Sequence, residues 1–322
     1  MRIAMMGSGG VGGYFGGRMA AVGCDVTFIA RGKHLQAIRE HGLKIASRDM
    51  GDVLVDPAKA SDRPEEVGPV DYVIVAVKLW DTQATGKAIL PMLGPETTVL
   101  SLQNGVEGDA ILAGIIGNQR LIGGVAFIAS SIGEPGVIKH IGTMQRVVIG
   151  EHSGGSSPRV EALREVLSKG GITAEISDDV ERTIWEKFVF LVGLSATTTL
   201  LRTPLGPVRA DPESRALLLS VMRETVSVAR ARGVALPEDF AETRLEFADG
   251  LPADMTSSMH HDIEAGNPLE LDWLSGAVTR FGREAGIPTP ANQRVSEALE
   301  PYAKRRSLIT RSSPCAASGR AS

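Results

Sequence analysis

The sequence predicts an α/β protein in which a doubly wound parallel sheet with appended antiparallel strands is followed by an all-α domain. Three observations predict this fold class. A short apolar strand and a glycine-rich turn open the chain at residues 1–17. Apolar runs of strand length then alternate with amphipathic stretches of helix length as far as Ile176. Beyond Asp178 every periodic segment is helical, so we expect a second domain without strands.

The first turn has the spacing of a dinucleotide-binding loop. After the strand at 2–6, Gly7, Gly9 and Gly12 fall at G-x-G-x-x-G spacing. Glycine permits the tight turn, the approach of a pyrophosphate and close packing of the next helix. A glycine-rich turn in another α/β fold is the alternative, but the helix and second strand that follow favour a Rossmann-type domain. The predicted cofactor-binding residues of the loop are Gly7, Ser8, Gly9, Gly10, Val11 and Gly12.

The end of the second strand (26–30) indicates which dinucleotide binds. An NAD-specific domain usually has Asp or Glu there for the ribose hydroxyls, but this strand ends in Ala30 and continues with Arg31, Gly32 and Lys33. Arg31 is suited to pair with a 2′-phosphate, and Lys33 is placed to support it. We therefore predict NADP(H), with a solvated basic loop as the alternative.

Composition sets limits on the class of protein. A chain of 322 residues with 43% hydrophobic and 22% charged residues is long enough for two domains of an ordinary globular protein. The net charge of −4 does not suggest a nucleic-acid partner. Cys24 and Cys315 form no disulfide framework, and no apolar run is read as a membrane span or a leader. We expect a cytoplasmic protein without a membrane partner.

Further elements of the first domain follow from hydrophobic patterning. The expected helices are 33–40, 79–93 and 158–169, and the expected strands are 43–46, 53–55, 70–77, 97–100 and 172–176. Residues 121–150, with a turn at 134–136, are expected to add antiparallel strands. Lys78 and Asn104 follow strand ends, as Gly7 does. Because ligands bind beyond the carboxyl ends of such strands, we predict that all three lie in one crevice.

The second domain is predicted to be helical throughout. The expected helices are 180–201, 212–232, 237–247, 255–264, 269–285 and 290–302. We place the domain boundary near Ser177, which gives a cofactor domain at 1–177 and a helical substrate and dimerisation domain at 178–306. Residues 307–322 have no periodicity and are predicted to be a disordered tail.

Candidate chemical groups lie in the helical domain. Lys187 is followed by the apolar run FVFLVGL, and a lysine facing an apolar cleft has a lowered pKa that suits a proton donor. A surface lysine on an amphipathic helix is the alternative. Glu270 and Asp272 by themselves are typical of carboxylates in a helix's first turn. The adjacent His260 and His261 do not support a metal site.

Six motifs in order resemble one family. They are GSGGVG at the N-terminus, VAVKLWD at Lys78, LQNG at Asn104, IWEKF at Lys187, SSM at Ser258 and ELDWLSG at Glu270. Their order and spacing resemble the ketopantoate reductase (2-dehydropantoate 2-reductase) family over the chain up to about Arg306.

The resemblance implies an oxidoreductase that reduces 2-dehydropantoate to pantoate with NADPH, in pantothenate synthesis. It implies that Lys187 is the general acid for the ketone oxygen and that Glu270 holds the substrate's hydroxyls. It further implies that Ser258 binds the carboxylate end and that Asn104 and Lys78 contact cofactor and substrate. A dimer formed through the helical domain is also implied.

The chain departs from the family pattern on the Lys187 helix. Members similar to the well-studied bacterial enzyme have asparagines four and eight residues after the lysine, where this chain has Leu191 and Ser195. Leu191 cannot hydrogen-bond a substrate hydroxyl, whereas Ser195 retains part of that ability. Two alternatives therefore stay open: a reductase of a bulkier or more apolar 2-oxo acid, and a non-catalytic NADP-binding protein.

Overall fold

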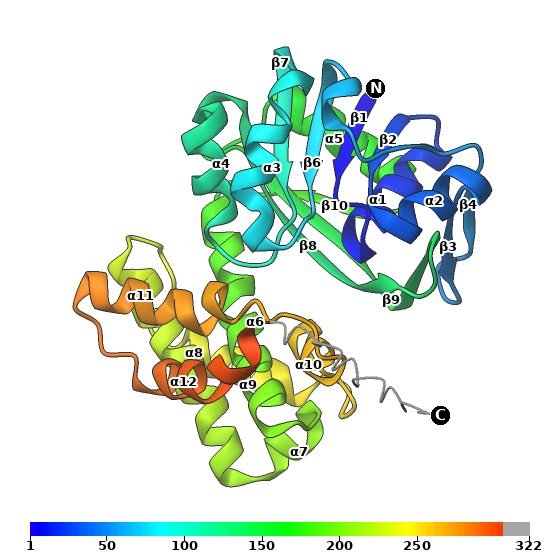
Figure 1. The fold of residues 1–322 in the computed structure, drawn as a ribbon. Helices are drawn as coiled ribbons and strands as arrows, with labels where there is room; N and C mark the ends of the chain where they lie inside the picture. Colours follow the sequence, from blue (N-terminus) through cyan, green and yellow to red (C-terminus); the bar gives the residue numbers. More distant parts are fainter. Residues whose placement is uncertain (305–322) are drawn as a thin grey trace, which may run out of the picture.

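The computed structural model describes residues 1–304, which form a sheet-containing half followed by a helical half (Figure 1). The long helix α6 (Val180–Leu201) leads from the first half into the second. The α/β class with a Rossmann-type sheet and a helical second domain is confirmed. The tail predicted for 307–322, which includes Cys315, lies outside the described residues.

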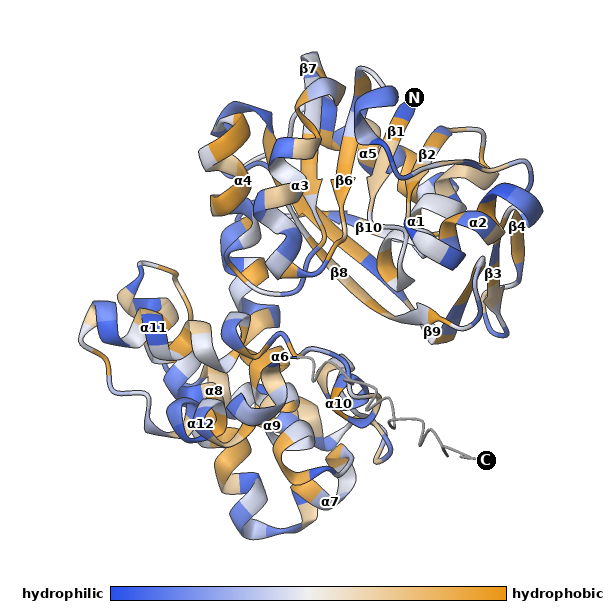
Figure 2. Cartoon of the chain, in the orientation of Figure 1, coloured by the Kyte–Doolittle hydropathy of each residue, from blue (hydrophilic) through white to orange (hydrophobic). Residues whose placement is uncertain are grey.

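The sheet is mostly parallel, and β1 lies between β2 and β6. Its strands are β1 (Arg2–Met6), β2 (Asp25–Ile29), β3 (Leu43–Ser47), β4 (Val53–Val55), β5 (Lys59–Ser61), β6 (Val70–Val75), β7 (Leu93–Ser101), β8 (Leu121–Ile132), β9 (Val137–Gly150) and β10 (Thr173–Ile176). Their order is β4-β3-β9-β8-β7-β6-β1-β2-β5, with β10 paired to β9. Strand β1 pairs in parallel with β2 and β6, and Ile3 and Met5 are fully buried there. Figure 2 shows β6 as hydrophobic along most of its length, as expected for a strand covered on both faces.

Strands β8 and β9 form the antiparallel pair expected at 121–150. In addition, β9 is parallel to both β3 and β10, and β8 is parallel to β7. The reason for the parallel pairing of β8 is α4 (Gly108–Ile116), a helix that the sequence reading missed and that returns the chain in the same direction before β8. Strand β5 was also missed, because its residues, KAS, do not form an apolar run.

The sheet-containing half also has α-helices, several of which pack on its strands. These helices are α1 (Gly10–Ala21), α2 (Gly32–His41), α3 (Thr82–Ala88), α4 and α5 (Pro158–Lys169). The single helix expected at 79–93 is wrong. The segment consists of a 3₁₀ turn (Leu79–Asp81), α3 and a second 3₁₀ turn (Leu90–Met92) that contains Pro91, and Leu93 already belongs to β7.

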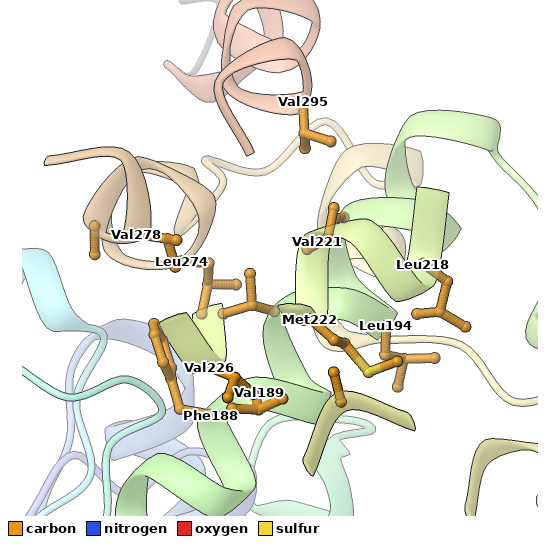
Figure 3. Packing of buried hydrophobic residues seen from close by; sticks show 14 of the residues in the cluster. Phe188, Val189, Leu194, Leu218, Val221, Met222, Val226, Leu274, Val278 and Val295 are labelled. Carbon is orange, nitrogen blue, oxygen red and sulfur yellow. The ribbon is translucent and has the colours of Figure 1, made fainter. Parts of the chain in front are cut away.

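The helical half packs around α6. Its other helices are α7 (Leu205–Ala210), α8 (Pro212–Ala231), α9 (Phe240–Asp249), α10 (Ser258–Glu264), α11 (Ser275–Ala285) and α12 (Pro290–Ala303). In Figure 3, Phe188, Val189 and Leu194 of α6 lie among buried side chains of α8, α11 and α12. This core fixes the helix that carries Lys187.

The helix expected at 269–285 is interrupted. Leu274 has φ −110° and ψ −103°, which no helix accepts, so a 3₁₀ turn (Leu271–Trp273) precedes α11. Glu270 lies before that turn and not inside a helix. The short helix α7 was not predicted.

Helix α6 also corrects an expectation about membrane spans. Within residues 1–304 it is the one helix that is long and apolar enough to cross a membrane by length and composition. Because 61% of its most apolar window is buried inside the protein, its apolar surface is covered as in a core helix.

Candidate active site

The glycine loop has the geometry that a dinucleotide requires. Gly7 has φ +94°, and a Cβ on Gly12 would lie 2.0 Å from the Gly7 carbonyl oxygen, so α1 approaches the turn too closely for a side chain there. A Cβ on Gly9 would point into open space, with no atom within 4 Å. Within residues 1–304 the N–H groups of Gly9, Gly10 and Val11 have no protein acceptor. These free donors at the start of α1 fit a pyrophosphate.

Arg31 lies beside this loop. It is the N-cap residue of α2, and both Arg31 and Lys33 are exposed. Among the described residues, the Arg31 guanidinium forms no ion pair or hydrogen bond, so its charge is available to a ligand. This position after β2 fits a 2′-phosphate.

Lys187 reaches from α6 to the sheet-containing half. Its Nζ donates to Asn104 Oδ1 at 2.6 Å and to the carbonyl oxygen of Ala126, on β8, at 2.7 Å. Burial lowers the pKa of Lys187 to about 8, although the Glu270 carboxylate acts to raise it. The group is therefore mostly protonated at neutral pH and loses its proton readily.

Lys78 and Glu270 form a second link between the two halves. Lys78 Nζ lies 2.8 Å from Glu270 Oε2 and 3.0 Å from Asp262 Oδ2, and the Leu79 N–H donates to Glu270 Oε1 at 3.2 Å. Burial alone would lower the pKa of Lys78, but Glu270 and Asp262 outweigh it and raise the pKa. Only 7% of Glu270 is exposed, so the Lys78 cation compensates a charge that would be costly to bury alone.

The structure thus brings together four predicted site residues from separate elements. Lys78 follows β6, Asn104 follows β7, Lys187 lies on α6 and Glu270 precedes α11. Sequence reasoning missed Asp262 and the Ala126 carbonyl. Asp262 lies four residues after Ser258 on α10, a spacing that was a usable signal, whereas a backbone carbonyl has none.

Leu191 and Ser195 follow Lys187 along α6. A small cavity beside Lys187 is lined by Gln103, Gly105, Gly124, Val125, Ile184, Lys187, Phe188 and Leu191. Leu191 is part of this apolar wall. Ser195 is fully buried, and its Oγ has no hydrogen-bond partner among the described residues.

Ser258 stands in a different environment. It is exposed and is the first residue of α10, while its neighbour Ser257 caps the helix by accepting a hydrogen bond from the His260 N–H. Its predicted contact with a substrate carboxylate stays a prediction.

A larger cavity lies nearby. It has a volume of about 480 Å³ and is lined by Leu79, Trp80, Gln83, Ala110, Ile111, Gly114, Ile115 and Trp273. No titratable side chain lines it, whereas Lys187 lines the smaller cavity. Residues 1–304 contain no group of three or more His, Cys, Asp or Glu able to hold a metal ion.

Comparisons with known proteins agree over nearly the whole chain. Residues 3–154 match the family described as Ketopantoate reductase PanE/ApbA, and residues 179–303 match Ketopantoate reductase PanE/ApbA C terminal. A 2-dehydropantoate 2-reductase of Mesorhizobium japonicum is 33% identical, over 90% of this chain and 94% of the relative.

Solved structures show the same fold. The crystal structure of 2-dehydropantoate 2-reductase from Geobacter metallireducens GS-15 is 33% identical, with a TM-score of 0.87 over 94% of this chain and 99% of that chain. The ternary structure of D-mandelate dehydrogenase with NADH and anilino(oxo)acetate, at 23% identity, has a TM-score of 0.85 over 94% and 98% of the two chains. At that identity the second likeness concerns the fold alone.

Proposed function

Because this chain belongs to the ketopantoate reductase family, we propose that it reduces 2-dehydropantoate to (R)-pantoate with NADPH, with Lys187 as general acid. The observation that carries the proposal is the position of the Lys187 ammonium. It is held between Asn104 and Ala126 and has a pKa of about 8. An amine of this kind has a proton to give at neutral pH.

The cofactor, when bound, supplies the hydride. The free N–H groups at Gly9, Gly10 and Val11 would hold its pyrophosphate, and the exposed Arg31 would hold the 2′-phosphate that distinguishes NADPH from NADH. Lys78 and Asn104 stand at the carboxyl ends of β6 and β7, where ligands of parallel sheets bind.

One N–H group of the Lys187 ammonium remains available to the substrate. An ammonium group carries three N–H donors, and two of those on Lys187 point to protein oxygens. The third is available to the ketone oxygen as negative charge develops on it. Transfer of that proton leaves a neutral amine, which the buried setting of Lys187 favours.

Other residues would orient the substrate. Glu270 is fixed by Lys78 and the Leu79 N–H, so its carboxylate is preorganised to accept hydrogen bonds from substrate hydroxyls. Ser195 has an unpartnered buried hydroxyl that would gain a partner, and Ser258 would bind the substrate carboxylate.

A different 2-oxo acid is a second candidate substrate, and Leu191 favours it. With Ile184 and Phe188, Leu191 gives the Lys187 cavity an apolar wall, which favours an apolar substrate group over a hydroxylated one. A substrate hydroxyl left without a partner against such a wall costs about 1–3 kcal/mol. The hydride and proton transfers would be the same for both substrates.

We further propose that the protein acts in the cytoplasm, in pantothenate synthesis, as a homodimer formed through the helical half. The support is the family membership, and size-exclusion chromatography with light scattering tests the oligomeric state. A single species at the mass of one chain, 34.0 kDa, would contradict the dimer.

The activity is tested by NADPH oxidation with purified protein. The panel contains 2-dehydropantoate, a branched apolar 2-oxo acid and an aromatic one, with Lys187→Ala beside wild type and Lys169→Ala as an exposed-lysine control. We expect 2-dehydropantoate to lead, the Lys187 variant to bind NADPH without turnover, and the control to match wild type. If another acid leads, the second candidate is correct. NADPH binding without turnover of any acid would contradict both.

A further inference from the structure

His34 joins the glycine loop to the turn between β8 and β9. It lies in the first turn of α2, three residues after Arg31. Its Nε2 is 2.8 Å from the carbonyl oxygen of Ser8, and the Gly136 N–H donates to its Nδ1 at 3.0 Å. His34 was not among the residues that the sequence predicted for the loop.

The two hydrogen bonds determine which ring nitrogen carries the proton. Because the Gly136 N–H can only donate, Nδ1 must accept, and the proton of the neutral ring is therefore on Nε2. Nε2–H then donates to the Ser8 carbonyl. Burial lowers the pKa of His34, although the bond to Ser8 acts to raise it, and a lowered pKa agrees with the neutral form.

The N–H, the carbonyl and the side-chain hydroxyl of Ser8 all form hydrogen bonds. Its N–H and its Oγ both donate to the Ile29 carbonyl oxygen, at 3.1 and 3.2 Å, and its own carbonyl accepts from His34. That carbonyl belongs to the same planar peptide unit as the Gly9 N–H, and in a trans peptide the two groups point in opposite directions. Fixing the carbonyl toward His34 therefore fixes the direction of the Gly9 N–H.

The Gly9 N–H is one of the free donors of the loop, and the space beside Gly9 is open. We propose that His34 is a positioning residue for the pyrophosphate site: its Nε2–H holds the Ser8–Gly9 peptide in the orientation that presents the Gly9 N–H to the anion. The inference rests on the dinucleotide site of the proposed function and extends it to a residue that does not touch the ligand.

Gly136, the hydrogen-bond partner of His34 Nδ1, is itself held by the sheet. Gly136 donates to His34, and its carbonyl oxygen accepts from the Lys44 N–H at 2.9 Å, on β3. Gly136 has φ +80°, a conformation that most residues with a side chain avoid. The ring is thus held against the sheet, and the orientation of the loop depends on strands far from it in sequence.

Three substitutions of His34 test its two hydrogen bonds separately. His34→Gln places an amide nitrogen near the position of Nε2 and keeps the donor to Ser8. His34→Asn places an amide oxygen near Nδ1 and keeps only the acceptor for Gly136. His34→Phe keeps the ring shape without either bond. Gln36→Ala is the matched control, because Gln36 is exposed on the same helix and, among residues 1–304, its side chain forms a hydrogen bond only with Glu40.

The measurement is the Kd for NADPH and for NADH, by quenching of protein fluorescence, together with kcat and KM. For Asn and Phe we expect both Kd values to rise by the same factor, about three- to tenfold, with kcat at saturating cofactor unchanged. The Gln variant is expected within about twofold of wild type, and the control is expected to equal wild type.

Other outcomes would overturn the inference. If the Asn and Phe variants bind both cofactors as wild type does, the orientation of the Ser8–Gly9 peptide does not depend on His34. A loss confined to NADPH would place the effect at Arg31 instead. If Asn and Phe do not fold, the Gln variant decides: near-normal affinity supports the proposal, and more than fivefold loss at a normal Tm overturns it. A wild-type protein that binds neither cofactor would remove the proposed function as well.

Discussion

At the scale of single residues, two opposing effects determine the pKa of Lys187. Burial lowers the pKa to about 8, and the carboxylate of Glu270 counteracts part of that shift. If the protonated amine is the acid, kcat/KM for ketone reduction is constant below pH 8. It then falls about tenfold per pH unit above that value, since the active form is lost as pH rises through the pKa. Initial rates between pH 6 and 10 measure this, and a profile flat to pH 10 would rule out Lys187 as the acid.

Glu270→Gln tests the contribution of the Glu270 charge to the pKa of Lys187. Because the Glu270 charge raises the pKa of Lys187, its removal is expected to move the alkaline limb of the pH profile to lower pH. The position of the limb is independent of any loss of substrate binding, which changes only the height of the profile. Asp272→Asn is the control, because Asp272 is exposed two residues away, and an equal shift in both variants would contradict the assignment.

Arg31 determines cofactor choice in the proposed function. Arg31→Met removes a charge-assisted hydrogen bond to the 2′-phosphate, so KM for NADPH is expected to rise roughly 10- to 100-fold while KM for NADH changes little. Lys33→Met is the neighbouring control and is expected to have a smaller effect. Equal changes for both cofactors would show that Arg31 does not read the 2′-phosphate.

From the sequence, a group could be named as a candidate site residue where it carries a recognisable motif, and its role stays a prediction. Lys187, Glu270, Asn104 and Lys78 were all named, and the structure places them at hydrogen-bond distance in two linked pairs. His34 was not, because it acts through contacts with segments distant in sequence. No local pattern encodes such a contact.

At the scale of elements, α6 presents Lys187, Leu191 and Ser195 at four-residue spacing, and therefore along one side of the helix. Leu191→Asn would restore a polar partner beside the acid. We expect kcat/KM for 2-dehydropantoate to rise relative to a branched apolar 2-oxo acid by on the order of tenfold, the worth of one hydrogen bond. The ratio of the two kcat/KM values is the measurement.

The control for this substitution is Leu201→Asn, at the exposed end of the same helix. It is expected to leave the ratio unchanged. If Leu191→Asn also leaves it unchanged, Leu191 does not face the distinguishing part of the substrate, and the apolar wall of the cavity is not what selects between the two acids.

Elements whose ends are marked by capping residues were predicted best. The bounds of α5 and α6 agree with the sequence prediction because capping residues and prolines mark their ends. Strand β5 and helix α7 were not predicted: β5 is not an apolar run, unlike the equally short β4, and the six residues of α7 show little periodicity. The helix expected at 269–285 was wrong because only the backbone at Leu274 interrupts it. The domain boundary near Ser177 stays a prediction, in the interval between β10 and α6.

At the scale of the whole molecule, the two halves meet through polar contacts that surround the site. Lys78 bonds Glu270 and Asp262, and Lys187 bonds Asn104. A further pair lies outside the site: Arg280 Nη2 of α11 is 2.8 and 2.7 Å from the two carboxylate oxygens of Glu107, at the start of α4. The proposed acid and the proposed cofactor loop come from different halves, so in the proposed function the spacing between the halves controls the chemistry.

The Arg280–Glu107 pair tests whether a contact that holds the two halves together also affects the reaction at Lys187. Its side chains are 42% and 19% exposed, so solvent and salt screen their attraction, and the pair is expected to contribute at most about 1 kcal/mol. Arg280→Met, Glu107→Gln and the double variant form a cycle whose coupling in kcat/KM should be about fivefold or less. That coupling should vanish in high salt, and the alkaline limb of the pH profile should stay near pH 8 in all three. A large coupling that persists in high salt, or a displaced limb, would show that this pair acts on Lys187 itself and that the two halves are coupled more tightly than an exposed ion pair allows.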